Sequence, residues 1–286
     1  MAVFAYRGRS VVYDRVGSGP PAFLLHNAGT QRHIWDDQVA ALRGRHTVIA
    51  LDLPGFGESD PATGHRLDDY VDMFAAFIDD QGGREAILIG NCVGSAIALS
   101  YADRHPDRVR ALVLCNPLTW NTVHGGASAG LARVDALLPL GPLARRLTLP
   151  EPAVSMIVAT QLGARGRRVG LHRSPRLRAH LNDRGRLFAL DRLVQDFPAY
   201  RALDTLRPGP EFPPICTLWG KQNRVLSAAA GARLDTTLRP HTSVVLDDCG
   251  HLPMAEDPDA VTAVVTGFLT AVTADRATRA TSTHAV

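Results

Sequence analysis

Lysine is almost absent from this chain of 286 residues, in which Lys221 is the only lysine among 31 basic Lys and Arg residues. No apolar run approaches the length of a membrane-spanning helix, and the first residues lack the basic and apolar segments of a secretory signal. The net charge is only +3, which argues against nucleic acid as the main partner. We therefore expect a cytoplasmic protein that binds neither membranes nor nucleic acid.

Cysteine is also scarce, and its spacing excludes proteins with CxxC motifs and disulfide-rich proteins. Cys92, Cys115, Cys216 and Cys249 form no CxxC pair and no disulfide-rich pattern. A reducing compartment is the default for such a chain, so each thiol needs its own explanation. We expect neither a metal nor a cofactor.

Short apolar runs alternate with amphipathic stretches along most of the chain. Such runs are typical of buried parallel strands, and the clearest helix, Leu67 to Ile78, is followed by the helix stop Gly82-Gly83. Strand and helix in alternation predict an α/β fold with a doubly wound, mostly parallel sheet. The six predicted strands are Ala22 to His26, Thr47 to Leu51, Ala86 to Ile89, Ala111 to Cys115, Ile215 to Trp219 and Ser243 to Leu246.

About a hundred residues without a strong strand signal separate the fourth and fifth predicted strands. We interpret residues 119–210 as a helical lid inserted into a core formed by residues 1–118 and 211–273, with residues 274–286 as a disordered tail. Between residues 131 and 186 the sequence has 11 arginines against three acidic residues. These arginines suit an acidic carrier protein or a phosphate group, and the alternative is a solvated surface.

The chemistry is centred on Gly90-Asn91-Cys92-Val93-Gly94, which stands between a predicted strand and a predicted helix. This is the nucleophile-elbow pattern with Cys in place of Ser. The two glycines let the helix pass close to the strand, because a side chain at either position would obstruct the crossing. We therefore predict that Cys92 is a nucleophile, the alternative being a buried core thiol.

Two further segments complete the predicted site. His26-Asn27-Ala28-Gly29 follows the first predicted strand, and the N–H groups of Ala28 and Val93 would form an oxyanion hole. His251 follows the last predicted strand and precedes a predicted terminal helix, Pro258 to Thr270, so it suits a general base. Pairing with His251 would lower the pKa of the Cys92 thiol.

With Asp52-Leu-Pro-Gly-Phe-Gly-Glu-Ser and Trp219-Gly220 added, the chain resembles the α/β-hydrolase superfamily over residues 20 to 273, apart from the insertion. The cysteine elbow resembles the cysteine-nucleophile branch, which includes Dieckmann cyclases and thioesterases that act on carrier-bound polyketides. The resemblance implies an acyl-transfer enzyme and an acid that orients the histidine.

Both usual positions of that acid lack a carboxylate. Asn223 stands after Trp219-Gly220, and the stretch Asn116 to Asn121 has neither Asp nor Glu. A thiolate–imidazolium pair needs only a neutral amide to hold the ring, as in papain-like sites. We predict that Asn223 orients His251, with Asn116, Asp247 and Asp248 in reserve.

Three functions fit this pattern. The acyl-Cys92 intermediate could be resolved by water, as in a thioesterase or carboxylesterase, or by another nucleophile, as in a cyclase or acyltransferase. The third function is non-catalytic binding of a small ligand. The expected substrate is a small acyl compound, presented by an acyl carrier protein if the arginines serve that purpose.

Overall fold

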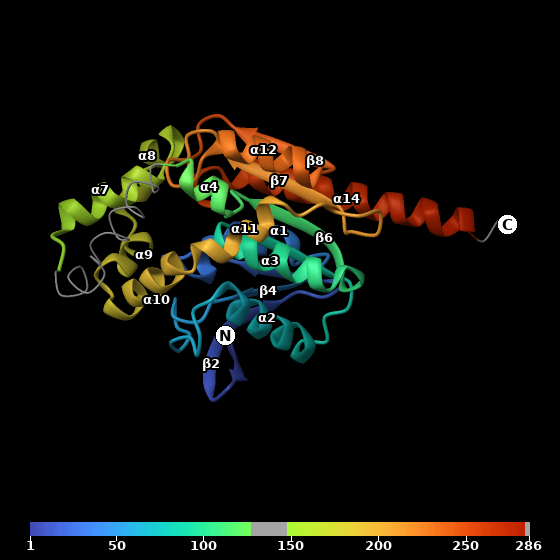
Figure 1. Cartoon of the computed structure of the whole chain (residues 1–286), viewed down its shortest axis with the longest axis horizontal. Coiled ribbons are helices and arrows are strands. Elements are labelled where there is room, and N and C mark those ends of the chain that lie inside the picture. Colours follow the sequence, from blue (N-terminus) through green and yellow to red (C-terminus); the bar gives the residue numbers. More distant parts are fainter. Residues whose placement is uncertain (127–147, 284–286) are drawn as a thin grey trace.

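A twisted mixed sheet runs through the computed structural model, which describes residues 1–126 and 148–283 (Figure 1). In the described residues the sheet has eight strands in the order β1-β2-β4-β3-β5-β6-β7-β8. Neighbouring strands from β4 to β8 in this order are parallel, and only the β1–β2 and β2–β4 pairs are antiparallel. The strands are β1 Ala2–Tyr6, β2 Arg9–Val16, β3 Pro21–Leu25, β4 Thr47–Leu51, β5 Ala86–Asn91, β6 Val109–Cys115, β7 Ile215–Gly220 and β8 Thr242–Leu246.

The six predicted strands are all present, with ends that differ by at most two residues. The N-terminal hairpin β1–β2 was not predicted, because most of its residues are exposed or only partly buried. Strand β8 also departs from the expected all-apolar burial, since its burial alternates and Val245 is exposed. This follows from its position at the edge of the sheet, where one side faces solvent.

Helices cover both faces of the sheet, which confirms the doubly wound arrangement. One buried cluster joins β3 to α2, α3 and α12, and the other joins β3 to α1 and α14. Helix α2 packs through an apolar face that includes Tyr70, Met73, Phe74 and Phe77, all of them buried. The helices of the core are α1 Asp36–Leu42, α2 Leu67–Asp80, α3 Val93–Arg104, α12 Ala228–Leu238, α13 Pro253–Glu256 and α14 Pro258–Thr283, with short 3₁₀ turns η1 Arg32–Trp35 and η2 Pro106–Arg108.

The regular elements described between β6 and β7 are all helices or 3₁₀ turns, and residues 127–147 of the predicted lid lie outside the described residues. Helices α7, α8, α9 and α10 gather at one end of the molecule, opposite the C-terminus (Figure 1). The described part of the insertion contains α4 Trp120–His124, α7 Glu151–Gln161, α8 Ala164–Arg168, η3 Leu171–Arg173, α9 Pro175–Arg178, η4 Ala179–Asn182, α10 Arg184–Gln195, η5 Phe197–Tyr200 and α11 Arg201–Asp204.

The C-terminal segment differs from the expected disordered tail. Helix α14 continues past Thr270 to Thr283, so residues 274–283 are helical, and residues 284–286 lie outside the described residues. Alanine and arginine between 274 and 280 favour helix, and this local propensity outweighs the scarcity of apolar residues on which the tail prediction was based. Among the described residues, no helix combines the length and apolar character needed to cross a bilayer.

Candidate active site

Cys92 occupies the turn between β5 and α3, as the elbow pattern predicts. Its backbone has φ 53° and ψ −113°, a conformation that non-glycine residues rarely adopt. A side chain at Gly94 would collide with the main-chain oxygens of Leu25 and His26, and one at Gly90 would come within 2.5 Å of the Ser95 nitrogen. The two glycines therefore allow the close crossing that holds Cys92 in its strained position.

The thiol of Cys92 is buried among apolar groups, with 8% of the residue exposed. Burial raises its pKa to about 12, and the opposing effect is a hydrogen bond from the Val93 N–H. The expectation that His251 lowers this pKa is wrong, because desolvation of the thiolate dominates. The raised pKa favours the neutral thiol form of Cys92 at physiological pH.

His251 lies in the turn after β8 and is 2% exposed. Its main-chain oxygen accepts hydrogen bonds from the side-chain nitrogens of Asn91 and Asn116, both at 3.2 Å. Burial lowers the pKa of its imidazole to about 4. Two asparagines thus fix the main chain of His251 beside the elbow, and its ring is neutral at physiological pH.

Asn223, the predicted orienter of His251, has its amide oxygen engaged elsewhere. This oxygen accepts hydrogen bonds from the main-chain nitrogens of Val225 at 2.9 Å and Leu226 at 3.0 Å. The side-chain nitrogen of Asn223 and the Nδ1 atom of His251 are both buried, and each lacks a hydrogen-bond partner among the described residues. The role of Asn223 toward His251 stays a prediction.

The reserve candidates have distinct positions. The amide oxygen of Asn116 accepts a hydrogen bond from the Gly220 N–H at 3.0 Å. Its side-chain nitrogen donates to the main-chain oxygens of Gly250 and His251. Asn116 therefore stabilises the main chain of the turn rather than the imidazole ring of His251. Asp247 is an exposed carboxylate that binds Lys221 at 2.7 Å. Asp248 is also exposed, and its carboxylate accepts from Gln222 at 3.3 Å. Both aspartates therefore have surface partners.

The predicted oxyanion segment is a tightly bonded turn. His26 is fully buried, its Nε2 accepts the Leu53 N–H at 2.9 Å, and its Nδ1 lies 2.8 Å from the Asn27 oxygen, so Nδ1 carries the proton. Strands β3 and β5 are parallel neighbours with Leu25 opposite Gly90. Ala28 and Val93 consequently follow adjacent strands at the same edge of the sheet, and their role as oxyanion donors stays a prediction.

Sequence reasoning missed Tyr200 of η5, which comes from the insertion. Tyr200 is fully buried in the same apolar cluster as Cys92, Leu118 and Leu193, and its hydroxyl has no hydrogen-bond partner among the described residues. Burial raises its pKa well above the ordinary value, and the nearby Asp196, Cys92 and Tyr70 groups contribute in the same direction. No sequence signal marks this residue, because only folding brings η5 near the elbow.

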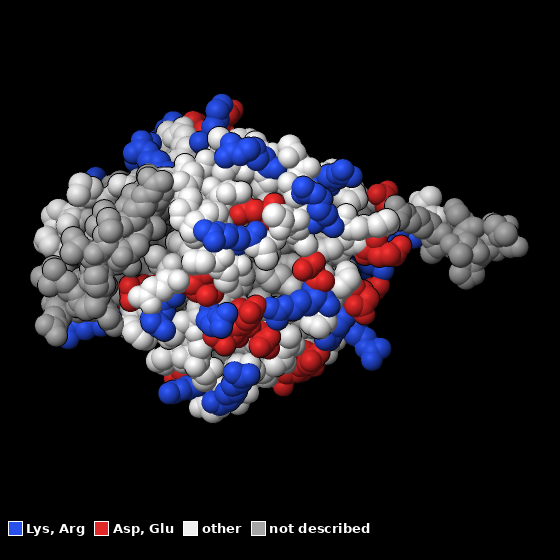
Figure 2. All heavy atoms as spheres, viewed as in Figure 1, with Lys and Arg blue, Asp and Glu red and all other residues white. Residues whose placement is uncertain are grey.

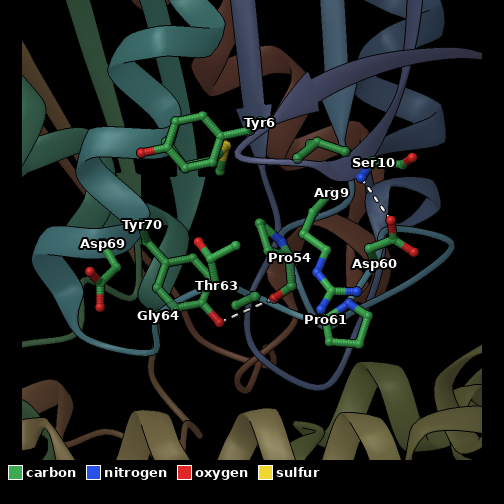
Figure 3. Close-up of a pocket in the computed structure, with 13 residues that line it drawn as sticks. Tyr6, Arg9, Ser10, Pro54, Asp60, Pro61, Thr63, Gly64, Asp69 and Tyr70 are labelled. Carbon is green, nitrogen blue, oxygen red and sulfur yellow. Dashed lines mark hydrogen bonds between the residues drawn. The ribbon is translucent and has the colours of Figure 1, made fainter.

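A separate small hollow, open to solvent, lies beside the β1–β2 hairpin (Figure 3). Its walls include Tyr6, Arg9, Asp60 and Tyr70, and the Tyr70 hydroxyl donates to the Pro54 oxygen at 3.1 Å. None of the lining residues is a predicted site residue. The described residues also contain no cluster of three His, Cys, Asp or Glu side chains that could bind a metal.

Comparison with known proteins gives the family. The sequence profile of the alpha/beta hydrolase fold matches residues 21–258. The chain belongs to the alpha/beta hydrolase fold family. This family match spans residues 26–29, the elbow and His251, and it confirms the inferred resemblance to the α/β-hydrolase superfamily.

Relatives of this alpha/beta hydrolase are themselves named as enzymes. It is 34% identical over 116 residues to haloalkane dehalogenase 2 of Mycobacterium tuberculosis, covering 40% of each chain. It is 36% identical over 110 residues to pimeloyl-[acyl-carrier protein] methyl ester esterase of Neisseria meningitidis, covering 38% of this chain and 34% of that protein. The chain thus matches less than half the length of these curated relatives.

Solved structures share the fold over almost the whole chain. A thermophilic esterase from Thermogutta terrifontis superposes with a TM-score of 0.78 at 22% identity, covering 94% of this chain and 97% of that one. Est816, described as an N-acyl homoserine lactone degrading enzyme, gives 0.74 at 22% identity, covering 93% and 100%. These likenesses establish the architecture of this alpha/beta hydrolase over almost its whole length.

Proposed function

We propose that this alpha/beta hydrolase cleaves an ester or thioester through an acyl-Cys92 intermediate, with His251 as the base. The observation that carries the proposal is the placement of Cys92 at the strained elbow, with the Val93 N–H beside its sulfur. Gly90 and Gly94, which allow the close crossing at the elbow, and the buried His251 support the same chemistry. Non-catalytic ligand binding would not require this combination.

The proposed first step forms a bond between the Cys92 sulfur and the substrate carbonyl carbon. The thiol proton passes to His251, and the carbonyl oxygen becomes an oxyanion bound by the N–H groups of Ala28 and Val93. Because the thiol pKa is about 12 and the imidazole pKa about 4, an ion pair is unfavourable before substrate arrives. Proton transfer therefore accompanies attack on the carbonyl.

The second step breaks the bond to the leaving alcohol or thiol, which takes the proton from His251. Water then adds to the acyl-Cys92 carbonyl, with His251 again accepting a proton, and the carboxylic acid leaves as the thiol is regenerated. A thioester is the favoured substrate, because the attacking group and the leaving group are then both thiols and have similar leaving-group quality. A polyketide-type acyl chain released by a thioesterase fits this scheme, and a simple carboxylesterase is the alternative.

A cyclase is the second candidate, and the dry surroundings of Cys92 favour it. Cys92 shares an apolar cluster with Leu118 and Val123 and with Leu193 of the insertion, and all four residues are buried. Exclusion of water would prolong the life of the acyl-Cys92 intermediate. A carbon, oxygen or nitrogen nucleophile of the acyl chain itself could then attack in place of water.

An acyl carrier protein is the proposed partner for such substrates. Positive and negative side chains are interspersed over the face in Figure 2, and several arginines of the insertion have acidic partners, as Arg165 does with Asp257 at 3.1 Å. Arg168 and Arg173 are exposed and have no ion pair within residues 1–126 and 148–283. These two residues are the proposed contacts for an acidic carrier, and Arg133, Arg145 and Arg146 lie outside the described residues.

The decisive experiment is covalent trapping with a simple acyl thioester. Wild-type protein and the Cys92→Ala variant are mixed with an acetyl or 3-oxoacyl thioester, quenched rapidly in acid and mapped by mass spectrometry. We expect the acyl mass on Cys92, with release of one thiol for each adduct, and no adduct in Cys92→Ala. Equal thiol release by both proteins would overturn the proposal.

Product analysis distinguishes the candidate reactions. A free 3-oxo acid indicates hydrolysis, and a product lacking the elements of water relative to that acid indicates cyclisation. Arg168→Ala with Arg173→Ala should weaken turnover of a carrier-bound substrate but not of a small thioester, most strongly at low salt. Arg176→Ala is the matched control, because Arg176 is an exposed arginine of the insertion that already pairs with Asp36 at 3.1 Å.

A further inference from the structure

Glu256 is a buried carboxylate directly beneath the His251 turn. It ends the short helix α13 and is 2% exposed. One carboxylate oxygen, Oε1, accepts hydrogen bonds from the main-chain nitrogens of Gly250 at 2.8 Å and Leu252 at 3.1 Å. These are the residues on either side of His251, so Glu256 holds the peptide groups that flank the proposed base.

The second carboxylate oxygen of Glu256 reaches the insertion. Oε2 accepts a hydrogen bond from the Gly163 nitrogen at 2.6 Å, at the junction of α7 and α8. A Cβ atom added to Gly166 would lie 2.7 Å from the same oxygen. A single side chain therefore binds the His251 turn through one oxygen and the insertion through the other.

Main-chain contacts reinforce this connection between distant segments. The His251 N–H donates to the Gln161 oxygen at 2.7 Å, and the Arg165 N–H donates to the Asp248 oxygen at 3.0 Å. A Cβ atom on Gly250 would lie only 2.5 Å from the Gln161 oxygen. Residues 161–166 and residues 248–252 thus pack backbone against backbone, and we call this contact the hinge joint.

The charges around Glu256 suit an ionised carboxylate. Burial raises its pKa, while the N–H groups of Gly250, Gly163, Leu252 and Gly166 lower it. Arg165 lies above the same helix end, with Nε 3.2 Å from the Glu256 main-chain oxygen and an ion pair to Asp257 at 3.1 Å. Asp248 and the buried Cys249 thiol are the other titratable groups nearby. An ionised carboxylate only accepts hydrogen bonds, which matches a site lined by N–H donors.

We propose that Glu256 is a positioning residue that sets the place of the His251 imidazole and ties it to the insertion through the hinge joint. The assignment rests on the proposed function only in taking His251 as the base. Since residues 161–166 are part of the joint, displacement of the insertion is transmitted to the base through Glu256. Loss of the carboxylate leaves the N–H groups at 163, 250 and 252 without their acceptor, and the turn that bears His251 moves or loosens.

The test uses Glu256→Gln, which keeps the shape of the side chain but turns an amide NH₂ toward N–H donors. Histidine-labelled protein is titrated by NMR to follow the His251 ring, and the rate of Cys92 acylation by an acetyl thioester is measured alongside. We expect the His251 pKa to rise from about 4 toward 6.5 as the ring gains water, and the acylation rate to fall at least tenfold with KM changed less than twofold.

Two further variants keep the result interpretable. Glu151→Gln removes an exposed carboxylate of the same insertion, paired with Arg178, and should leave both readouts unchanged. If Glu256→Gln does not fold, Glu256→Asp retains the charge with a shorter reach and should show the same changes in weaker form.

The outcomes separate this inference from the proposed function. A folded Glu256→Gln or Glu256→Asp protein with wild-type His251 titration and wild-type acylation, even at a lower melting temperature, would show a purely structural role and overturn the inference. Absence of acylation in the wild type contradicts the proposed function instead, and the NMR titration still tests Glu256.

Discussion

The side-chain nitrogen of Asn91 donates a hydrogen bond to the main-chain oxygen of His251, 160 positions further along the chain, at 3.2 Å. Asn91 immediately precedes the elbow cysteine, so one side chain connects the elbow to the turn that bears His251. Asn116 donates to the same oxygen from the end of β6. Two side-chain amides therefore fix the main chain of His251, whereas its imidazole Nδ1 has no partner among the described residues.

Asn116→Ala should destabilise the protein and slow acylation of Cys92. The substitution leaves the buried Gly220 N–H without its acceptor, which costs about 1–3 kcal/mol, and frees the carbonyl groups at 250 and 251. Urea unfolding and acylation kinetics measure the two effects. Asn121→Ala, an exposed asparagine in the same stretch, is the control. Equal stability of the two variants would contradict the bracing role of Asn116.

Cys92→Ser should lose most of the activity while keeping the fold. A serine proton is transferred efficiently only to an imidazole supported by an anion, and loss of that anion costs about 10⁴ in rate in a Ser–His–Asp site. The predicted orienter here is the neutral Asn223. Stopped-flow measurement of thiol release from a thioester gives the comparison. Activity of Cys92→Ser within tenfold of wild type would mean that an undetected anion supports His251.

The Cys92 thiol of the free protein should react slowly with iodoacetamide at neutral pH. Burial raises its pKa to about 12, so the thiolate fraction and the alkylation rate should increase about tenfold for each pH unit between 7 and 10. Peptide mapping distinguishes Cys92 from the other three buried cysteines. A rate that is already maximal at pH 6 would reveal a preformed thiolate–imidazolium pair and contradict this expectation.

Stability should fall as the pH drops from 6.5 toward 4. His251 has a pKa of about 4 in the folded state against 6.5 as the ordinary value, so the unfolded chain binds the extra proton within this window and folding is disfavoured. The full difference corresponds to about 3 kcal/mol. Urea unfolding across this range measures the loss. His26, also buried with a lowered pKa, contributes in the same direction, so His251→Gln should reduce the acid sensitivity without removing it.

Tyr200→Phe should separate stability from activity. The Tyr200 hydroxyl is buried without a partner among the described residues, so its removal should leave the free energy of unfolding unchanged or raise it by up to about 1 kcal/mol. If the hydroxyl binds an oxygen of the acyl chain, turnover of a 3-oxoacyl thioester should fall at least tenfold while that of the plain acyl thioester stays the same. Equal effects on both substrates would exclude this contact.

The sequence predicted the features whose causes are local. Glycines at 90 and 94 identify the elbow because no side chain fits there, and the apolar runs identify strands because both faces of five of the six, all except β8, are buried. Helix α14 was predicted too short, because a polar surface gives little information about where a helix ends once it leaves the core.

Features that depend on contacts between distant segments were not predictable. The raised pKa of Cys92 follows from burial by residues of the insertion and the core, which no motif reports. Glu256 stands five positions after His251 in an ordinary helical sequence, and only the fold places the insertion against it. Nor did the sequence indicate that the amide oxygen of Asn223 accepts hydrogen bonds from the main-chain nitrogens of Val225 and Leu226.

The hinge joint limits where the insertion of this enzyme can be exchanged for that of another protein. A chimera that exchanges the insertion at the strand ends, after β6 and before β7, would replace Gly163 and Gly166 together with the helices around them. A donor with larger side chains at those positions would then displace the His251 turn. Residues 161–166 therefore belong with the core of the fold, and a graft that begins beyond Arg168 keeps the host's contact between these residues and the His251 turn.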